Sequence, residues 1–264
     1  MKLTIVSAIS VAFMASASSV AAYEGHVERE LIVGGEAVAS GTKTYVAGLR
    51  VRRDSESFCG GTLITPTHVL TASHCIVYGP HWVSIGEHYK NGTEIGEQIK
   101  IVSIMSHPNF TGGVELSNDF SILELQKPSK FKPVKLAAAD DSDFKPEKMA
   151  TVMGWGVDAE ANGTYMHELQ RVDVPLVSDE ACAAYITADS AMVCAGGVAN
   201  YDACDQDSGG PLIVESAGAE DVLVGFVSWA KDNACGREDY YGVYARVSSA
   251  RAWIETITSG SCLS

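Results

Sequence analysis

The chain has 264 residues, 46% of them hydrophobic, which is enough to bury the core of one all-β domain or of two packed halves and argues against disorder. Its formal net charge of -14 at pH 7 argues against nucleic acids and anionic membranes as partners and favours encounter with basic substrates. After the N-terminal segment, no stretch approaches the roughly twenty apolar residues that a membrane helix needs.

Residues 1–22 have the layout of a secretory signal. Lys2 precedes an apolar stretch from Leu3 to Met14, and small residues follow up to Ala22, where we expect cleavage. A buried N-terminal helix is the weaker alternative. A short polar stretch, 23–31, separates this segment from the compact region. We therefore expect a secreted, extracellular protein.

Short β-rich runs follow, such as 45–49 and 81–85, separated by Gly, Asn and Asp clusters. Many short strands with turn signals between them indicate a sandwich or a barrel. A polar segment, 127–148, is typical of a connection between two halves. The first half then covers 32–136 and the second half 137–264.

The second half has further β-rich runs, and only its tail shows a helical pattern. The apolar run 222–227 is one of these runs. In the tail, Ser248 or Ser249 can cap a helix whose apolar face would be formed by Trp253, Ile254 and Ile257.

The sequence contains seven cysteines, an odd number. In a secreted chain they are expected to form disulfides, and one thiol must stay free, be capped or pair with another molecule. No C-x-x-C pair and no histidines at helical metal-ligand spacing occur, so we expect no metal and no cofactor. Three sequons predict N-glycosylation at Asn91, Asn109 and Asn162.

Three segments carry residues suited to acyl transfer by serine, which needs a nucleophilic hydroxyl, a base and an acid that orients the base. Ser208 lies in a glycine-rich turn, His74 follows an apolar run, and Asp119 precedes one. Alone, the histidine would be interpreted as a core residue and the aspartate as a turn cap. The order in which the three residues occur, His before Asp before Ser, changes that interpretation.

The order His, Asp, Ser in these contexts resembles the chymotrypsin and trypsin family over residues 32–260. The matching motifs are Ile32-Val33-Gly34-Gly35, 59–64, the three segments above, Gly154-Trp155-Gly156, Ser228-Trp229 and Gly242-Val243-Tyr244. The resemblance implies an all-β fold of two packed six-stranded antiparallel β-barrels with a C-terminal helix. The site would lie in the cleft between the barrels, and 23–31 would be a propeptide.

The resemblance also implies the role of each site residue. Ser208 would be the nucleophile, His74 the general base and Asp119 its orienting acid, while the backbone N–H groups of Gln206 and Ser208 would form the oxyanion hole. It pairs the cysteines as Cys59 with Cys75, Cys182 with Cys194, and Cys204 with Cys235. Cys262 is left over.

Substrate choice would depend on Asp202, which the resemblance places at the floor of the primary pocket. A buried carboxylate stays ionised only when a cation pairs with it, so cleavage after Arg or Lys is expected. Many relatives carry a hydroxyl at the position of Ala203, and its absence favours Arg over Lys. The pocket wall would be formed by Ser228, Trp229, Ala230 and Gly242.

The sequence departs from the family pattern at several of these positions. Activation would pair a new Ile32 ammonium with Asp207, but Leu31 precedes it, so a different protease must cut there. Gln206 stands where glycine is usual, and if its backbone N–H turned away, the oxyanion hole would lose one donor. Ala230 replaces another common glycine, and Tyr241 replaces a proline, as in a sodium-responsive branch of the family.

Two functions remain open after this comparison. Segments 41–45, 66–70 and 96–101 resemble the oomycete glucanase inhibitor proteins, virulence effectors that share the fold, have lost catalysis and block a plant endoglucanase. Their pattern lacks an intact triad, whereas all three residues are present here. The first prediction is therefore a secreted, monomeric trypsin-like serine endopeptidase, and the alternative is a glucanase inhibitor. No sequence feature favours a haptoglobin-like binding module.

Overall fold

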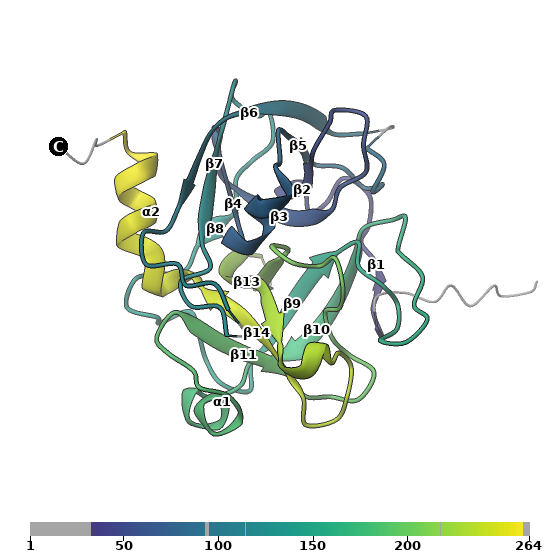
Figure 1. Cartoon of the computed structure of the whole chain (residues 1–264), viewed down its shortest axis with the longest axis vertical. Coiled ribbons are helices and arrows are strands. Elements are labelled where there is room, and N and C mark those ends of the chain that lie inside the picture. Colours follow the sequence, from purple (N-terminus) through teal and green to yellow (C-terminus); the bar gives the residue numbers. More distant parts are fainter. Residues whose placement is uncertain (1–32, 93–94, 114, 217, 261–264) are drawn as a thin grey trace, which may run out of the picture.

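The computed structural model describes residues 33–92, 95–113, 115–216 and 218–260, which form two β-rich halves (Figure 1). The first half is a closed barrel in the order β2-β3-β4-β7-β6-β5. Its strands are β2 Val46–Arg50, β3 Cys59–Thr65, β4 His68–Thr71, β5 Trp82–Ile85, β6 Glu97–Ser106 and β7 Ser121–Leu125. In β6, buried Ile99 and Ile101 alternate with exposed Lys100 and Val102, the period of two expected of a barrel wall.

The second half is an eight-stranded sheet in the order β1-β10-β9-β12-β13-β14-β11, with β8 pairing to β13. Its strands are β1 Glu36–Ala37, β8 Lys135–Leu136, β9 Met149–Gly154, β10 Gln170–Pro175, β11 Met192–Gly196, β12 Pro211–Val214, β13 Val222–Ala230 and β14 Tyr241–Arg246. An antiparallel bridge between Leu176 and Ala195 joins the two ends of the six-strand path β10 to β11. The predicted fold of two packed barrels is confirmed.

Two of the eight strands come from the first part of the chain. β1 pairs with β10, and β8 runs parallel to β13. Each is two residues long, so each adds a short strap to the second sheet rather than a full barrel strand. One strap precedes the first barrel in the chain and the other follows it, so both ends of the first half pair with the second sheet.

Within the described residues, helical structure is confined to short pieces: α1 Asp179–Tyr185, α2 Arg251–Thr258 and the 3-10 turns η1 Ser73–Tyr78, η2 Lys231–Asn233 and η3 Val247–Ala250. The tail helix α2 was predicted, and its Ile254 is fully buried. Its cap differs from the prediction, because Ser248 and Ser249 lie in η3 and bond to Asp141 and the Arg246 carbonyl instead. The unpredicted α1 begins at the Ser178 cap, whose hydroxyl accepts from the Ala181 N–H.

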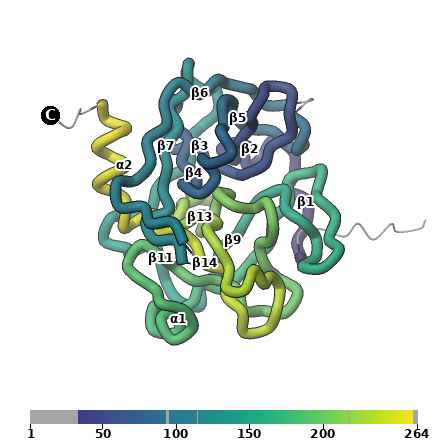
Figure 2. Tube along the Cα trace, in the orientation of Figure 1, coloured from purple at the N-terminus to yellow at the C-terminus, as the bar shows by residue number. Residues whose placement is uncertain are grey.

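The two halves pack against each other, with β13 and β9 of the second half next to β3 and β4 of the first (Figure 2). Phe120, just before β7, packs edge-to-face on Phe226 of β13 with ring centroids 5.4 Å apart. The Gly60 N–H of β3 donates to the Ser208 carbonyl at 2.7 Å. The packing therefore places the turn before β12 directly against the first barrel.

Candidate active site

His74 and Asp119 lie in direct contact at the edge of the first barrel. The His74 Nδ1 atom is 2.8 Å from Asp119 Oδ2, and the His74 backbone N–H donates to Asp119 Oδ1 at 2.9 Å. A third donor, the Ser228 hydroxyl, reaches Oδ2 at 2.6 Å. These donors satisfy a carboxylate that is only 1% exposed. Because Nδ1 donates to Asp119, the Nε2 atom is left to act as an acceptor.

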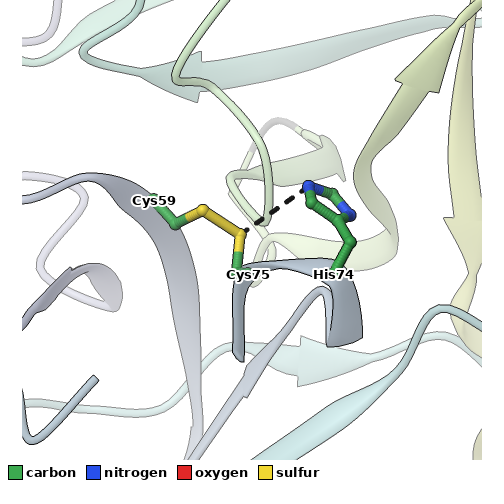
Figure 3. Close-up of side chains that lie close together, drawn as sticks. All are labelled: Cys59, His74 and Cys75. Atoms are coloured by element: carbon green, nitrogen blue, oxygen red, sulfur yellow. Dashed lines mark hydrogen bonds between the residues drawn. A yellow bond between two sulfur atoms is a disulfide. The ribbon is translucent and has the colours of Figure 1, made fainter. Parts of the chain in front are cut away.

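The Ser208 hydroxyl lies on the other side of the cleft, and both Ser208 and His74 line the same cavity. Among the described residues, no hydrogen bond joins this hydroxyl to the imidazole. The His74 Nε2 atom instead lies 3.8 Å from Cys75 Sγ (Figure 3). The Cys59–Cys75 disulfide therefore forms the wall beside the imidazole. Its sulfur atoms are oxidised, so they are not the thiolate ligands of a soft metal site.

The turn that precedes Ser208 has an unusual backbone. Gln206 has φ 71°, in the left-handed region that favours glycine. Its N–H and that of Ser208 make no hydrogen bond within the described part of the chain, so both are available as donors to a ligand. The Gln206 carboxamide is held from the opposite barrel, because its Oε1 accepts from the Lys90 ammonium at 2.5 Å.

Asp207 is fully buried beneath this turn. Its carboxylate accepts from the Gly156 N–H at 2.8 Å and the Cys204 N–H at 2.9 Å. Burial raises the pKa of Asp207 to about 7, against the lowering effect of these two donors and of the Lys90 charge. Ile32, the predicted partner of Asp207, lies outside the described residues.

A cavity of about 240 Å³ is lined by both Ser208 and Asp202. Asp202 is 2% exposed; its Oδ2 accepts from the Gly236 N–H at 3.1 Å. Its Oδ1 has no hydrogen-bond partner within the described residues. Burial raises the pKa of Asp202 to about 7. The cavity lining includes the other residues predicted for it, Ala203, Ser228, Trp229, Ala230 and Gly242.

Two features of this site were missed by the sequence analysis. Ser228 was predicted only as pocket wall, but its hydroxyl also bonds Asp119. Lys90 was not singled out at all, since it lies 116 positions from Gln206 and in no recognisable motif. Of the residues predicted for catalysis, His74, Gln206 and Ser208 line the same cavity, and Asp119 contacts His74.

The three disulfides join the same cysteines that the resemblance paired, Cys59–Cys75, Cys182–Cys194 and Cys204–Cys235. Cys262 and the predicted signal lie outside the described residues. At the sequons, Asn109 and Asn162 are exposed and Asn91 is partly buried. Within the described ranges, no helix is both long and apolar enough to cross a bilayer.

Comparison with known proteins gives one family and two groups of relatives. The Trypsin family model matches residues 32–254. The chain is 47% identical to Glucanase inhibitor protein 3 of Phytophthora infestans, over 97% of this chain and 99% of that protein. It is 49% identical to Glucanase inhibitor protein 4 of the same organism over 82% of the chain and 86% of that protein. A Trypsin from Saccharopolyspora erythraea is 37% identical over 83% of the chain and 94% of that protein.

Proposed function

Because this chain belongs to the trypsin family, we propose that it is a secreted glucanase inhibitor that uses the protease fold as a binding scaffold. The observation that carries the proposal is its 47% identity, along almost the whole of both chains, to a protein named as a glucanase inhibitor. Its identity to a named trypsin is lower, 37%. The order of the two predicted functions is thereby reversed, with inhibition first.

The geometry of the nucleophile supports this order. The Ser208 hydroxyl makes no hydrogen bond with His74 within the described residues, whereas a nucleophile and its base must come within hydrogen-bonding reach when substrate is bound. Gln206 stands in the oxyanion turn at φ 71°, where a side chain is strained.

A second function, hydrolysis of peptide bonds after Arg or Lys, is favoured by a specific set of contacts. Asp119 holds His74 and Ser228 with three hydrogen bonds, as a general base requires. Buried Asp202, whose Oδ1 has no partner within the described residues, lines the cavity, and a basic side chain bound there would supply one. In this function Ser208 would be the nucleophile and the N–H groups of Gln206 and Ser208 the oxyanion donors.

Both functions require export, and the second also requires processing. The proposed sequence of events is removal of residues 1–22, glycosylation at the sequons and cleavage after Leu31, which frees the Ile32 ammonium for Asp207. Basic substrates would meet an acidic surface, since the net charge is -14.

The decisive experiment compares the processed protein, starting at Ile32, with its Ser208→Ala variant. Each is mixed with a secreted plant endo-β-glucanase, and the release of reducing sugar is measured alongside cleavage of an arginyl chromogenic peptide. We expect equal glucanase inhibition by both proteins, because binding does not use the hydroxyl. Loss of inhibition in the variant, together with peptide cleavage by the parent protein, would establish the endopeptidase instead. Absence of inhibition by either protein would reject the inhibitor proposal.

A further inference from the structure

Lys90 connects the first barrel to the turn that carries Ser208. It lies between β5 and β6 and is only 6% exposed. Its Nζ donates to Gln206 Oε1 at 2.5 Å and lies 4.3 Å from the centre of the Tyr165 ring. A lysine with its ammonium held in this way has lost the hydration it would keep at a surface, so the contact with Gln206 replaces water.

The loop that carries Lys90 is fixed independently of Gln206. The fully buried Arg50 guanidinium donates to the carbonyls of Lys90 and Asn91, each at 3.0 Å, and to the Glu87 carboxylate at 2.8 Å. The Lys90 N–H donates to the His167 carbonyl at 2.8 Å. Lys90 is thus anchored at its backbone, and its side chain is the part that reaches across to the turn.

Gln206 is the part of this contact that needs support. At φ 71° its Cβ crowds the neighbouring carbonyl, and such a residue persists only where surrounding contacts hold it. The turn has internal hydrogen bonds from Asp207 N–H to Cys204 and from Gly210 N–H to Asp207. The first of these bonds closes a four-residue turn with Gln206 in its third position, so it restrains the backbone there but leaves the Gln206 side chain free. The only side-chain hydrogen bond of Gln206 within the described residues is the one from Lys90.

We propose that Lys90 is a positioning residue, which holds the Gln206 carboxamide and thereby keeps the 204–208 turn in its left-handed conformation without glycine. The inference rests on the second proposed function, because this turn would carry the oxyanion donors. The ammonium also lowers the pKa of buried Asp207, so the same side chain supports two neighbouring residues. Lys90 thus acts on Ser208 through Gln206 rather than by contact with a substrate.

A double-mutant cycle read by hydrogen exchange tests the proposal. Amide exchange of the segment 203–210 is compared in the parent protein, Lys90→Met, Gln206→Gly and the double variant. We expect Lys90→Met to speed exchange in this segment about tenfold, equivalent to about 1.4 kcal/mol. In the Gln206→Gly background the same substitution is expected to have a much smaller effect, because glycine adopts φ 71° without help and only the charge near Asp207 is then lost. Equal effects in both backgrounds would overturn the proposal.

Two further variants serve as controls for the hydrogen bond itself and for the loss of any lysine. Gln206→Ala removes the same hydrogen bond from the other side and should speed exchange as Lys90→Met does, so parent-like exchange in this variant would also overturn the inference. Lys132→Met, which removes an exposed lysine paired with Glu220, should leave the segment unchanged. Exchange requires neither glucanase nor peptide turnover, so this result is separate from the outcome for either proposed function.

Discussion

The two sides of the cleft are built in different ways. On the base side, Asp119 receives hydrogen bonds from the His74 N–H, His74 Nδ1 and the Ser228 hydroxyl. On the nucleophile side, Asp207 receives two backbone donors from the described residues, and burial raises its pKa to about 7. The base side is therefore satisfied by the folded chain, whereas the nucleophile side needs charge from elsewhere.

The same contrast applies to the pocket. Asp119 and Asp202 are almost equally buried, at 1% and 2% exposure. Asp119 has partners for both oxygens, but Oδ1 of Asp202 has none within the described residues. Buried polar atoms without a partner are rare because each forfeits its hydration. A cation bound beside Asp202 would therefore supply a partner that the described chain does not, whereas the base side needs none.

The largest expected effect comes from disturbing the space around Asp207. A Cβ at Gly156 would lie 2.3 Å from Asp207 Oδ2 and 2.7 Å from the Asp205 carbonyl oxygen. Both atoms are held by the turn and cannot retreat. We expect Gly156→Ala to lower the free energy of unfolding by about 3 kcal/mol, the upper range for overpacked cores. Urea denaturation followed by fluorescence measures it.

Gly112→Ala is the matched control, because a Cβ there meets no atom within 4 Å. Its unfolding free energy should stay within about 0.5 kcal/mol of the parent. If the two alanine variants unfold at the same urea concentration, the structure around Asp207 can accommodate an added methyl group. The contrast between the two sides of the cleft would then be wrong.

The next largest effect concerns the pH dependence of stability, which tests the buried charge of Asp202. Its pKa rises from 3.8 in the unfolded chain to about 7 in the folded protein. The folded state therefore binds the proton more tightly, and this group lowers stability progressively as pH rises from about 4 to about 7. Asp202→Asn should increase the unfolding free energy at pH 8 by on the order of 2 kcal/mol and leave it unchanged near pH 3.5.

Thermal unfolding across pH 3.5 to 8 measures this difference, with Asp54→Asn as the control because that pair with Arg52 is highly exposed. Asp207 shifts in the same direction, so the Asp202 variant should lose only part of the pH dependence. A variant that is less stable than its parent at pH 8 would show that Asp202 is already satisfied in the free protein.

The fold could be predicted because its signals are local and repeated. Short β-rich runs between turn residues indicated barrels. Prediction from local pattern failed at α1, which follows the Ser178 cap. α1 spans seven residues, too few turns for a helical period to emerge. The straps β1 and β8, of two residues each, have no pattern of their own, and only the packing of the whole chain pairs them with the second sheet.

The site was predictable where a motif surrounds the residue and unpredictable where the contact crosses the cleft. His74 and Asp119 stood in recognisable segments, and the structure joins them at 2.8 Å. Lys90 and Gln206 are 116 positions apart, and nothing in either segment indicates the other. A contact of this kind depends on how two barrels pack, which propensity and periodicity do not encode.

The smallest effect distinguishes a charged from a neutral hydrogen bond on the base side. Ser228→Ala removes the 2.6 Å bond to the Asp119 carboxylate and should lower the unfolding free energy by about 1.5 kcal/mol. Ser106→Ala, which removes a 2.8 Å bond to the Ser121 hydroxyl, should cost about 0.5 kcal/mol. Urea midpoints of both variants at pH 7 make the comparison. Equal losses would mean that Asp119 is adequately held by His74 alone, and the base side would then be less dependent on the second barrel than its three donors suggest.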